Sequence, residues 1–217
     1  TFEIPAKRGE ILASDGFLLA ANEPAYLVYA TSDDLKEKPE KIAGKIAPIL
    51  VDESLVKETE ELVKQRLERD DLDWVPLQHK ISGSTKEAIE NLKITGLGFE
   101  LESNRSYPEG SSAAHLLGFV GSDTNGLDKG YFGLEGFYDL ELRGKTGILR
   151  REKDASGRPI LVSNPKEEKQ TDGRTLLTTI DRPIQYLVEE KLLQGLRRYG
   201  AINGSVVVME PKTGAIL

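Results

Sequence analysis

Cysteine is absent from the chain, histidine occurs only twice, and no apolar run approaches the roughly 18 to 20 residues that span a bilayer. The absence of cysteine excludes disulfides, thiolate metal sites and thiol nucleophiles, and it is compatible with an extracytoplasmic location without requiring one. Because His79 and His115 are the only histidines, a metal site would need carboxylates for most of its ligands, and no cluster has ligand spacing. We therefore expect neither a metal nor a cofactor.

Acidic residues outnumber basic ones by 36 to 29, which gives a formal net charge of -7. The basic pairs at residues 150–151 and 197–198 are isolated rather than gathered into a stripe, so the chain repels a phosphate backbone. We expect no nucleic-acid partner. The chain begins at Thr1 in an amphipathic stretch without a signal-peptide pattern, so any membrane anchor of a longer parent protein is expected to be absent here.

The beginning of the chain has the alternating pattern of strands. Asp15 and Gly16 favour a hairpin turn because both residues tolerate positive φ. On either side of this turn and beyond it, alternation predicts strands over 8–13, 17–20 and 25–30.

A helix-rich segment follows. Pro39 opens one predicted helix, and Ser54 is expected to cap a second. A strand over 74–81 precedes a helix that the capping-box spacing of residues 84–87 opens and that Gly96 ends. This segment predicts a small helical insertion.

The middle of the chain returns to mixed patterns. A strand over 99–106 leads through a turn at 107–110 into a short helix that ends at Leu117. Residues 123–130 are rich in Gly, Asp and Asn and predict a loop, whereas 134–142 predict a helix.

The last third combines a hairpin, a linker and one long helix. Residues 147–162 predict a hairpin with its turn at 154–157, residues 163–173 a polar linker, and 175–180 a strand. A helix is predicted over 183–199, with Asp181 near its N-terminus. The apolar face of this helix is expected to be core, docked on a buried strand that starts at Ser205 and leads through a tight turn into a second strand. Strands mixed with segregated helices indicate an α+β architecture.

Four segments of the chain carry short motifs. The first is Arg-Gly-Glu-Ile at 8–11 with Gly16. The second is Arg-Ser-Tyr-Pro-Glu-Gly at 105–110 followed by residues 114–121. The third is a glycine-rich stretch from 133 to 147 with a Gly-Arg pair after it, and the fourth is 177–189 with the terminal residues. In content and order these segments resemble class B penicillin-binding proteins, except that Ala13-Ser14 replaces the Asp-Arg of the family in the first one. The positions that match these motifs are Arg8, Gly9, Gly16, Arg105, Tyr107, Pro108, His115, Gly118, Gly121, Gly133, Glu135, Gly136, Asp139, Gly144, Gly147, Gly157, Asp181 and Gln185.

The resemblance implies a domain organisation. Residues 1–172 correspond to an elongated, β-rich N-terminal pedestal or dimerisation domain, with a helix-rich head insertion at 35–95. Residues 173–217 correspond to the first helix and strands of an incomplete transpeptidase domain.

The resemblance also implies a function and partners. The chain is expected to be the noncatalytic extracytoplasmic pedestal that positions a serine D,D-transpeptidase for peptidoglycan cross-linking, at the outer face of the bacterial plasma membrane. The implied partners are its own C-terminal transpeptidase domain, a SEDS-type glycosyltransferase, other cell-wall machinery and a second copy through self-association. Elongation and division roles are not distinguished. A noncatalytic module that binds peptidoglycan or another partner is the alternative.

The active-site motifs of the family are not assembled in this chain. Ser-x-x-Lys occurs at 54–57 and 163–166, and Lys-Thr-Gly occurs at 145–147 and 212–214, but no Ser-x-Asn is present. Ser54 is better explained as a helix cap, Pro165 breaks the helical turn that would pair a serine with its lysine, and both Lys-Thr-Gly strings fit turns. We expect no catalytic residue.

Glu135 and Asp139 leave a hydrolase as a third hypothesis. Four residues apart on one predicted helix, their carboxylates would share a face and would divide acid and base work as in glycosidases. The preferred interpretation is structural, with both acids paired to arginines such as Arg8 or Arg105. His115 is expected to hydrogen-bond the turn around Pro108.

Overall fold

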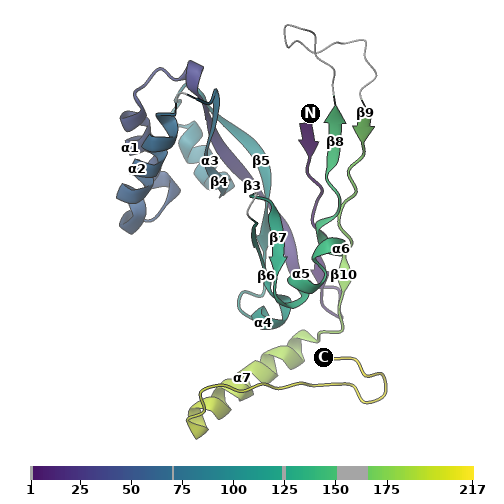
Figure 1. Cartoon of the computed structure of the whole chain (residues 1–217). Coiled ribbons are helices and arrows are strands. Elements are labelled where there is room, and N and C mark those ends of the chain that lie inside the picture. Colours follow the sequence, from purple (N-terminus) through teal and green to yellow (C-terminus); the bar gives the residue numbers. More distant parts are fainter. Residues whose placement is uncertain (1, 70, 124–125, 151–165) are drawn as a thin grey trace. The chain divides into compact units, whose positions relative to one another are not determined.

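The computed structural model describes residues 2–69, 71–123, 126–150 and 166–217 (Figure 1). Helices and strands are mixed, and the strands form open sheets, so the α+β class is confirmed. Contacts divide the chain into two units, Thr1–Asn22 with Arg105–Leu217 (unit 1) and Glu23–Asn104 (unit 2). The predicted insertion at 35–95 lies inside unit 2, and the boundary at 172–173 stays a prediction.

Unit 2 is a small sheet covered by helices. Its strands are the greater part of β3 (Leu18–Thr31), then β4 (Trp74–Ile81) and β5 (Leu97–Ser106), both of which pair with β3. The helices are α1 (Pro39–Leu50), α2 (Val56–Leu67) and α3 (Gly83–Glu90), with 3-10 turns at Ser32–Asp34 and Glu53–Leu55. Apolar side chains of the strands and helices form one core, which includes Val28, Ile42, Ile46, Val63, Leu77 and Ile89.

Two sequence predictions in unit 2 are confirmed and two are wrong in detail. α1 begins at Pro39, and β4 has the predicted bounds. Ser54 caps no helix, because it lies inside the 3-10 turn and α2 begins after Leu55 without a side-chain cap. The cap of α3 is Ser82, whose Oγ accepts a hydrogen bond from the Thr85 amide at 3.1 Å, two residues before the predicted position.

Predicted strands 17–20 and 25–30 are one continuous strand, β3. Its first residues pair with β2 (Ile11–Leu12), and its later residues pair with β4. Partners at both ends hold the polar stretch between the two predicted strands in an extended conformation, with register shifts near Val28. The turn at Asp15 and Gly16 is confirmed by the hydrogen bond from the Gly16 amide to the Ala13 carbonyl, at 2.9 Å.

Unit 1 combines short strands and short helices with the long helix α7 (Arg182–Tyr199). β1 (Phe2–Ile4), β8 (Gly147–Arg150) and β9 (Lys166–Glu168) form an antiparallel sheet, and β10 (Leu176–Leu177) runs parallel to β2. β6 (Phe119–Ser122) and β7 (Asp128–Tyr131) form a two-stranded sheet. The helices are α4 (Ala114–Leu117), α5 (Gly133–Phe137), α6 (Asp139–Arg143) and α7 (Arg182–Tyr199). The core of unit 1 includes Ile11, Leu19, Leu117, Leu142 and Ile180.

Several predictions for unit 1 are corrected by tertiary pairing. The predicted loop at 123–130 contains β7, because its glycine and aspartate residues pair with β6. The predicted helix at 134–142 is two short helices, and the predicted strands at 8–13 and 175–180 each retain two strand residues. The polar linker at 163–173 contains β9 and a bridge between Thr171 and Lys145.

The two Lys-Thr-Gly strings differ in conformation. Lys145 is bridged and Gly147 opens β8, so the first string is extended, whereas 212–214 lie in a turn as predicted. The predicted turn at 154–157, Gly157 and the string at 163–165 lie outside the described residues.

The end of the chain is more exposed than predicted. Met209 and Ile216 form a single bridge around the turn, but Val207 is 74% exposed, so the predicted buried strand is wrong. α7 has no buried residue, because little of the described chain covers its apolar face. Among the helices that the structure describes, none combines the length and apolarity required to cross a membrane.

Candidate functional site

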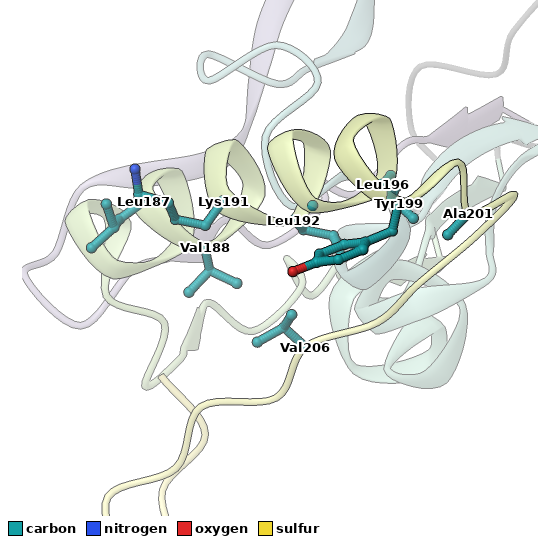
Figure 2. Close-up of a pocket in the computed structure, with 9 residues that line it drawn as sticks. Leu187, Val188, Lys191, Leu192, Leu196, Tyr199, Ala201 and Val206 are labelled. Atoms are coloured by element: carbon teal, nitrogen blue, oxygen red, sulfur yellow. The ribbon is translucent and has the colours of Figure 1, made fainter.

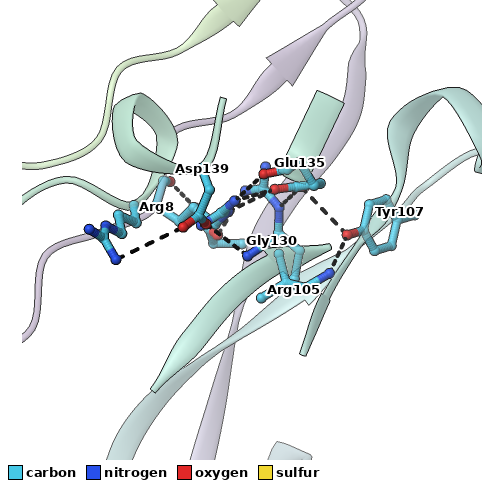
Figure 3. A network of polar contacts seen from close by, with 9 residues as sticks. Arg8, Arg105, Tyr107, Gly130, Glu135 and Asp139 are labelled. Carbon is cyan, nitrogen blue, oxygen red and sulfur yellow. Dashed lines mark hydrogen bonds and ion pairs between the residues drawn. The ribbon is translucent and has the colours of Figure 1, made fainter. Parts of the chain in front are cut away.

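Glu135 is the centre of a buried polar network in unit 1 (Figure 3). Its side chain is 0% exposed, and each carboxylate oxygen faces a different arginine. The Nε of Arg8 donates to Oε2 at 2.8 Å, and the Nε of Arg105 donates to Oε1 at 2.7 Å. The side chains of Arg8 and Arg105 are themselves 8% and 4% exposed. The three charges are therefore removed from water together and depend on one another.

Asp139 extends the network to the next helix. Arg8 donates from Nη1 to Oδ1 of Asp139 at 2.8 Å, and the amide of Gly130 donates to the same oxygen at 2.7 Å. The Nη2 of Arg8 also donates to the carbonyl of Glu135 at 3.1 Å. The two acids lie on α5 and α6 rather than on one helix face, and Arg8 brings them together. The predicted pairing of these acids with Arg8 and Arg105 is present.

Gly130 lets the backbone approach this network closely. A Cβ there would lie 2.0 Å from the carbonyl oxygen of Glu135 and 2.7 Å from Nη2 of Arg8. A larger residue would displace the guanidinium from both acids. Gly130 was not among the site residues predicted from the sequence. It is the last residue of the glycine- and aspartate-rich segment 123–130, for which a loop was predicted.

Asn22 joins the two arginines through its side-chain amide. Its Oδ1 accepts from Nη1 of Arg105 at 3.0 Å, and its Nδ2 donates to the carbonyl of Arg8 at 2.5 Å. Within the described ranges, Nη2 of Arg105 is a buried donor without a hydrogen-bond partner. Asn22 was also missed by the sequence analysis, although a polar residue that breaks strand alternation is a usable signal.

Tyr107 borders the network with its hydroxyl. The hydroxyl donates to Oε1 of Glu135 at 3.5 Å and accepts from the amide of Val120 at 3.1 Å. Burial, and then the negative charge of Glu135, raise the pKa of Tyr107 to about 12. The phenol is therefore a neutral donor that supports the carboxylate at ordinary pH.

The backbone around the network is strained at one aromatic residue. Phe132 has φ 57° and ψ 173°, a region that bulky residues rarely adopt, and its side chain is 76% exposed. Gly133, the next residue, has φ 48°, and Gly118, at the end of α4, has φ 76°; a Cβ on Gly118 would lie 2.2 Å from the Phe132 carbonyl oxygen. These motif glycines allow α4 and α5 to meet in close backbone contact.

A second set of glycines holds the chain before α7 against the segment that leads into β2. The amide of Gly9 donates to the Leu142 carbonyl at 2.7 Å, and a Cβ on Gly9 would lie 2.0 Å from the Arg174 carbonyl. A Cβ on Gly173 would lie 1.7 Å from the same Leu142 oxygen. Three backbone segments thus cross where only glycine fits, and Gly144 adds a turn with φ 68°.

The remaining motif residues contribute no side chain to the Glu135 network. Asp181, predicted near the N-terminus of this helix, caps α7 with Oδ1 accepting from the Ile184 amide at 3.0 Å, and Gln185 donates to Glu189 at 2.6 Å. His115 lies exposed on α4 and its side chain makes no hydrogen bond to the described residues, so its predicted hydrogen bond to the turn around Pro108 is wrong. The short α4 directs this side chain to solvent. Gly121 and Gly136 occupy β6 and α5, where neighbours approach but do not overlap.

The network has the chemistry of a structural centre. Glu135 is inaccessible and its two oxygens are occupied by guanidinium groups, so it cannot transfer a proton to a substrate without first losing its partners. Among the described residues, no group of three or more histidine and acidic side chains has the geometry of a metal site.

Comparison with known proteins gives this geometry a family. The sequence profile described as Penicillin-binding Protein dimerisation domain matches residues 3–178. The chain is 30% identical over 212 residues to stage V sporulation protein D of Bacillus subtilis, covering 97% of this chain and 31% of that protein. It is 28% identical over 218 residues to the probable peptidoglycan D,D-transpeptidase PenA of Neisseria gonorrhoeae, covering 100% of this chain and 36% of that protein.

Solved structures agree on the fold. In a complex between penicillin-binding protein PBP2 and MreC from Helicobacter pylori, one chain matches with a TM-score of 0.70 and 18% identity, covering 100% of this chain and 41% of that one. The chain spans about a third of the length of the curated relatives named above. The chain therefore belongs to the penicillin-binding protein dimerisation domain family, and its relatives are class B penicillin-binding proteins.

Proposed function

We propose that this chain is the noncatalytic pedestal of a class B penicillin-binding protein and positions a serine D,D-transpeptidase for peptidoglycan cross-linking. The observation that carries the proposal is the Glu135 network. Its ion pairs join segments 30 and 127 residues apart in the sequence. A buried, fully engaged carboxylate of this kind serves to hold segments together rather than to react with a substrate.

The exposed apolar face of α7 is evidence for an additional domain that packs next to the pedestal (Figure 2). Leu187, Val188, Leu192 and Tyr199 line an apolar groove closed on one side by Val206. Tyr199 is 78% exposed and Leu187 is 52% exposed. An apolar stripe of this extent normally packs against a core, so we assign its cover to the remainder of a transpeptidase domain.

Location and partners follow from the same proposal. We place the pedestal on the extracytoplasmic side of the bacterial plasma membrane, where cross-linking takes place. The Helicobacter pylori complex pairs a structural relative with MreC, which favours partners from the cell-wall machinery. Among these partners we propose a SEDS-type glycosyltransferase and a second copy of the chain.

Fluorescent penicillin distinguishes the pedestal from an enzyme. The 217-residue chain and the same protein extended through its natural C-terminus would be labelled side by side, with an excess of unlabelled penicillin as the control. We expect covalent label only on the extended protein. Label on the short chain would overturn the proposal and return attention to Ser54.

The alternative functions have their own tests. If the extended protein lacks Ser-x-x-Lys, Ser-x-Asn and Lys-Thr-Gly in that order and takes no label, the module that binds peptidoglycan or a partner without catalysis replaces the transpeptidase pedestal. The hydrolase hypothesis predicts peptidoglycan cleavage by the short chain that Asp139→Asn abolishes. The occupied oxygens of Glu135 argue against it.

A further inference from the structure

One arginine at the start of α7 contacts two separate turns of unit 1. The guanidinium of Arg182 lies 3.7 Å from the centre of the Phe17 ring. Its Nη1 donates to Oε1 of Glu109 at 2.6 Å, and its Nε lies 3.4 Å from Oδ2 of Asp15. Asp15 and Phe17 belong to the turn between β2 and β3, whereas Glu109 belongs to the turn after β5. A planar guanidinium is suited to this combination, because it stacks on a ring and donates along its edge at once.

A second contact holds α7 farther along its axis. Oε1 of Glu189 accepts a hydrogen bond from the backbone amide of Ala113 at 2.8 Å and another from Gln185 at 2.6 Å. Ala113 is buried and has φ 54°, a conformation that alanine rarely adopts. The carboxylate therefore satisfies a buried amide that the turn leaves without a helical partner.

The two contacts are separated along the helix. Arg182 and Glu189 are two turns apart, which is about 10 Å along the helix axis. Immediately before α7, the amide of Ser14 donates to the carbonyl of Ile180 at 2.9 Å. A single contact leaves a helix free to swing, whereas two contacts at separate points also fix its direction.

We propose that Arg182 and Glu189 lock the direction of α7 on unit 1, and that Arg182 is a positioning residue for the domain that covers the open face of α7. The role of Arg182 as a positioning residue rests on the proposed function, because the proposed function identifies the covering domain as a transpeptidase domain. The lock itself concerns only the described residues of unit 1. Loss of either contact should let α7 swing while the Glu135 network stays intact.

Spin labels on a cysteine pair measure this motion directly. The chain has no cysteine of its own, so Glu141→Cys on α6 and Gln194→Cys on α7 would be the only labelled positions. Both side chains are exposed. With Arg182 and Glu189 present, we expect one narrow distance distribution. With Arg182→Ala or Glu189→Ala, the distribution should broaden, and the Ser14 and Ala113 amides should exchange hydrogen about tenfold faster or more.

Matched variants separate the lock from general destabilisation. Arg197→Ala removes a charge from the exposed last turn of the same helix and should leave the distribution narrow. Arg182→Lys keeps the charge but lacks the flat stacking surface, so it should give an intermediate width even if the alanine variant folds poorly. The reversed pair Arg182→Glu with Glu109→Arg should restore part of the narrow component.

Two outcomes would overturn the lock. One is an unchanged narrow distance distribution in Arg182→Ala, in Glu189→Ala and in the variant that combines them. The other is a broad distribution in the spin-labelled protein that keeps both Arg182 and Glu189. Penicillin labelling is independent of these measurements. If the distance distributions show the lock but the extended protein takes no penicillin label, only the transpeptidase assignment fails. If the extended protein takes the label but the distributions show no lock, only this inference fails.

Discussion

Neutralising Glu135 tests whether the buried network holds unit 1 together. Glu135→Gln preserves the shape of the side chain but removes its charge. One of the two arginines must then face an amide NH2 group instead of an oxygen. The side chains of Arg8 and Arg105, 8% and 4% exposed, would remain as buried cations, and the new side chain would offer them one oxygen in place of a charged carboxylate.

Two estimates of the loss in unfolding free energy agree. Breaking a buried ion pair by removing one partner costs about 3–5 kcal/mol of unfolding free energy. The carboxylate accepts charge-assisted hydrogen bonds of 2.8 and 2.7 Å from two arginines, and at about 1.5–3 kcal/mol each these give about 3–6 kcal/mol. We expect a loss of about 4 kcal/mol, which corresponds to a Tm lowered by about 8–16 °C for a chain of this length.

The assay should resolve the two units. Urea unfolding followed by circular dichroism reports on the whole chain, whereas the fluorescence of Trp74, the single tryptophan, reports on unit 2. Hydrogen exchange of peptides from β6 and α5 localises the loss to unit 1. The matched control is Glu90→Gln, which removes a pair with Lys86 whose acid is 47% exposed and should cost less than about 1 kcal/mol. A cost for Glu135→Gln no larger than this control would refute the reasoning.

Two further predictions concern Tyr107 and the glycine crossing. Because the pKa of Tyr107 is raised from 10.0 to about 12, its contribution to stability is complete below pH 10 and is lost as pH rises towards 12. Tyr107→Phe should therefore remove the most alkaline phenolate step from an ultraviolet titration, and persistence of that step would assign it to another tyrosine. Gly173→Ala places a Cβ 1.7 Å from the Leu142 carbonyl oxygen and should lower the unfolding free energy by about 1–3 kcal/mol or more. Gly195→Ala, with open space around its Cβ on α7, should instead raise it by up to about 1 kcal/mol; equal effects of the two substitutions in urea titrations would contradict the steric argument.

Local signals were sufficient where a few neighbouring residues decide the conformation. Pro39 starts α1 and Asp181 caps α7, because a fixed φ and a side-chain oxygen act on the adjacent turn. Asp15 and Gly16 make the predicted hairpin turn for the same reason. The order of short motifs was also sufficient to identify the family, which the match over residues 3–178 bears out.

Local signals failed where distant partners decide. The stretch between the two halves of β3 has a strand-breaking sequence but is extended, because β2 and β4 pair on either side of it. The glycine-rich residues before Tyr131 form β7 because β6 supplies the hydrogen bonds. Ser54 had the right side chain for a cap, but a 3-10 turn occupies the position.

The sequence by itself determined the family, the α+β class and the charged residues of the site, because these depend on composition, periodicity and motif order, but it did not indicate Asn22 or Gly130. Only the tertiary structure decided how the site works. Nothing in the local sequence shows that Glu135 is 0% exposed, or that arginines 30 and 127 residues away each take one of its oxygens. Burial and charge pairing depend on the whole fold, and they turn two acids with glycosidase-like spacing into the structural centre of unit 1.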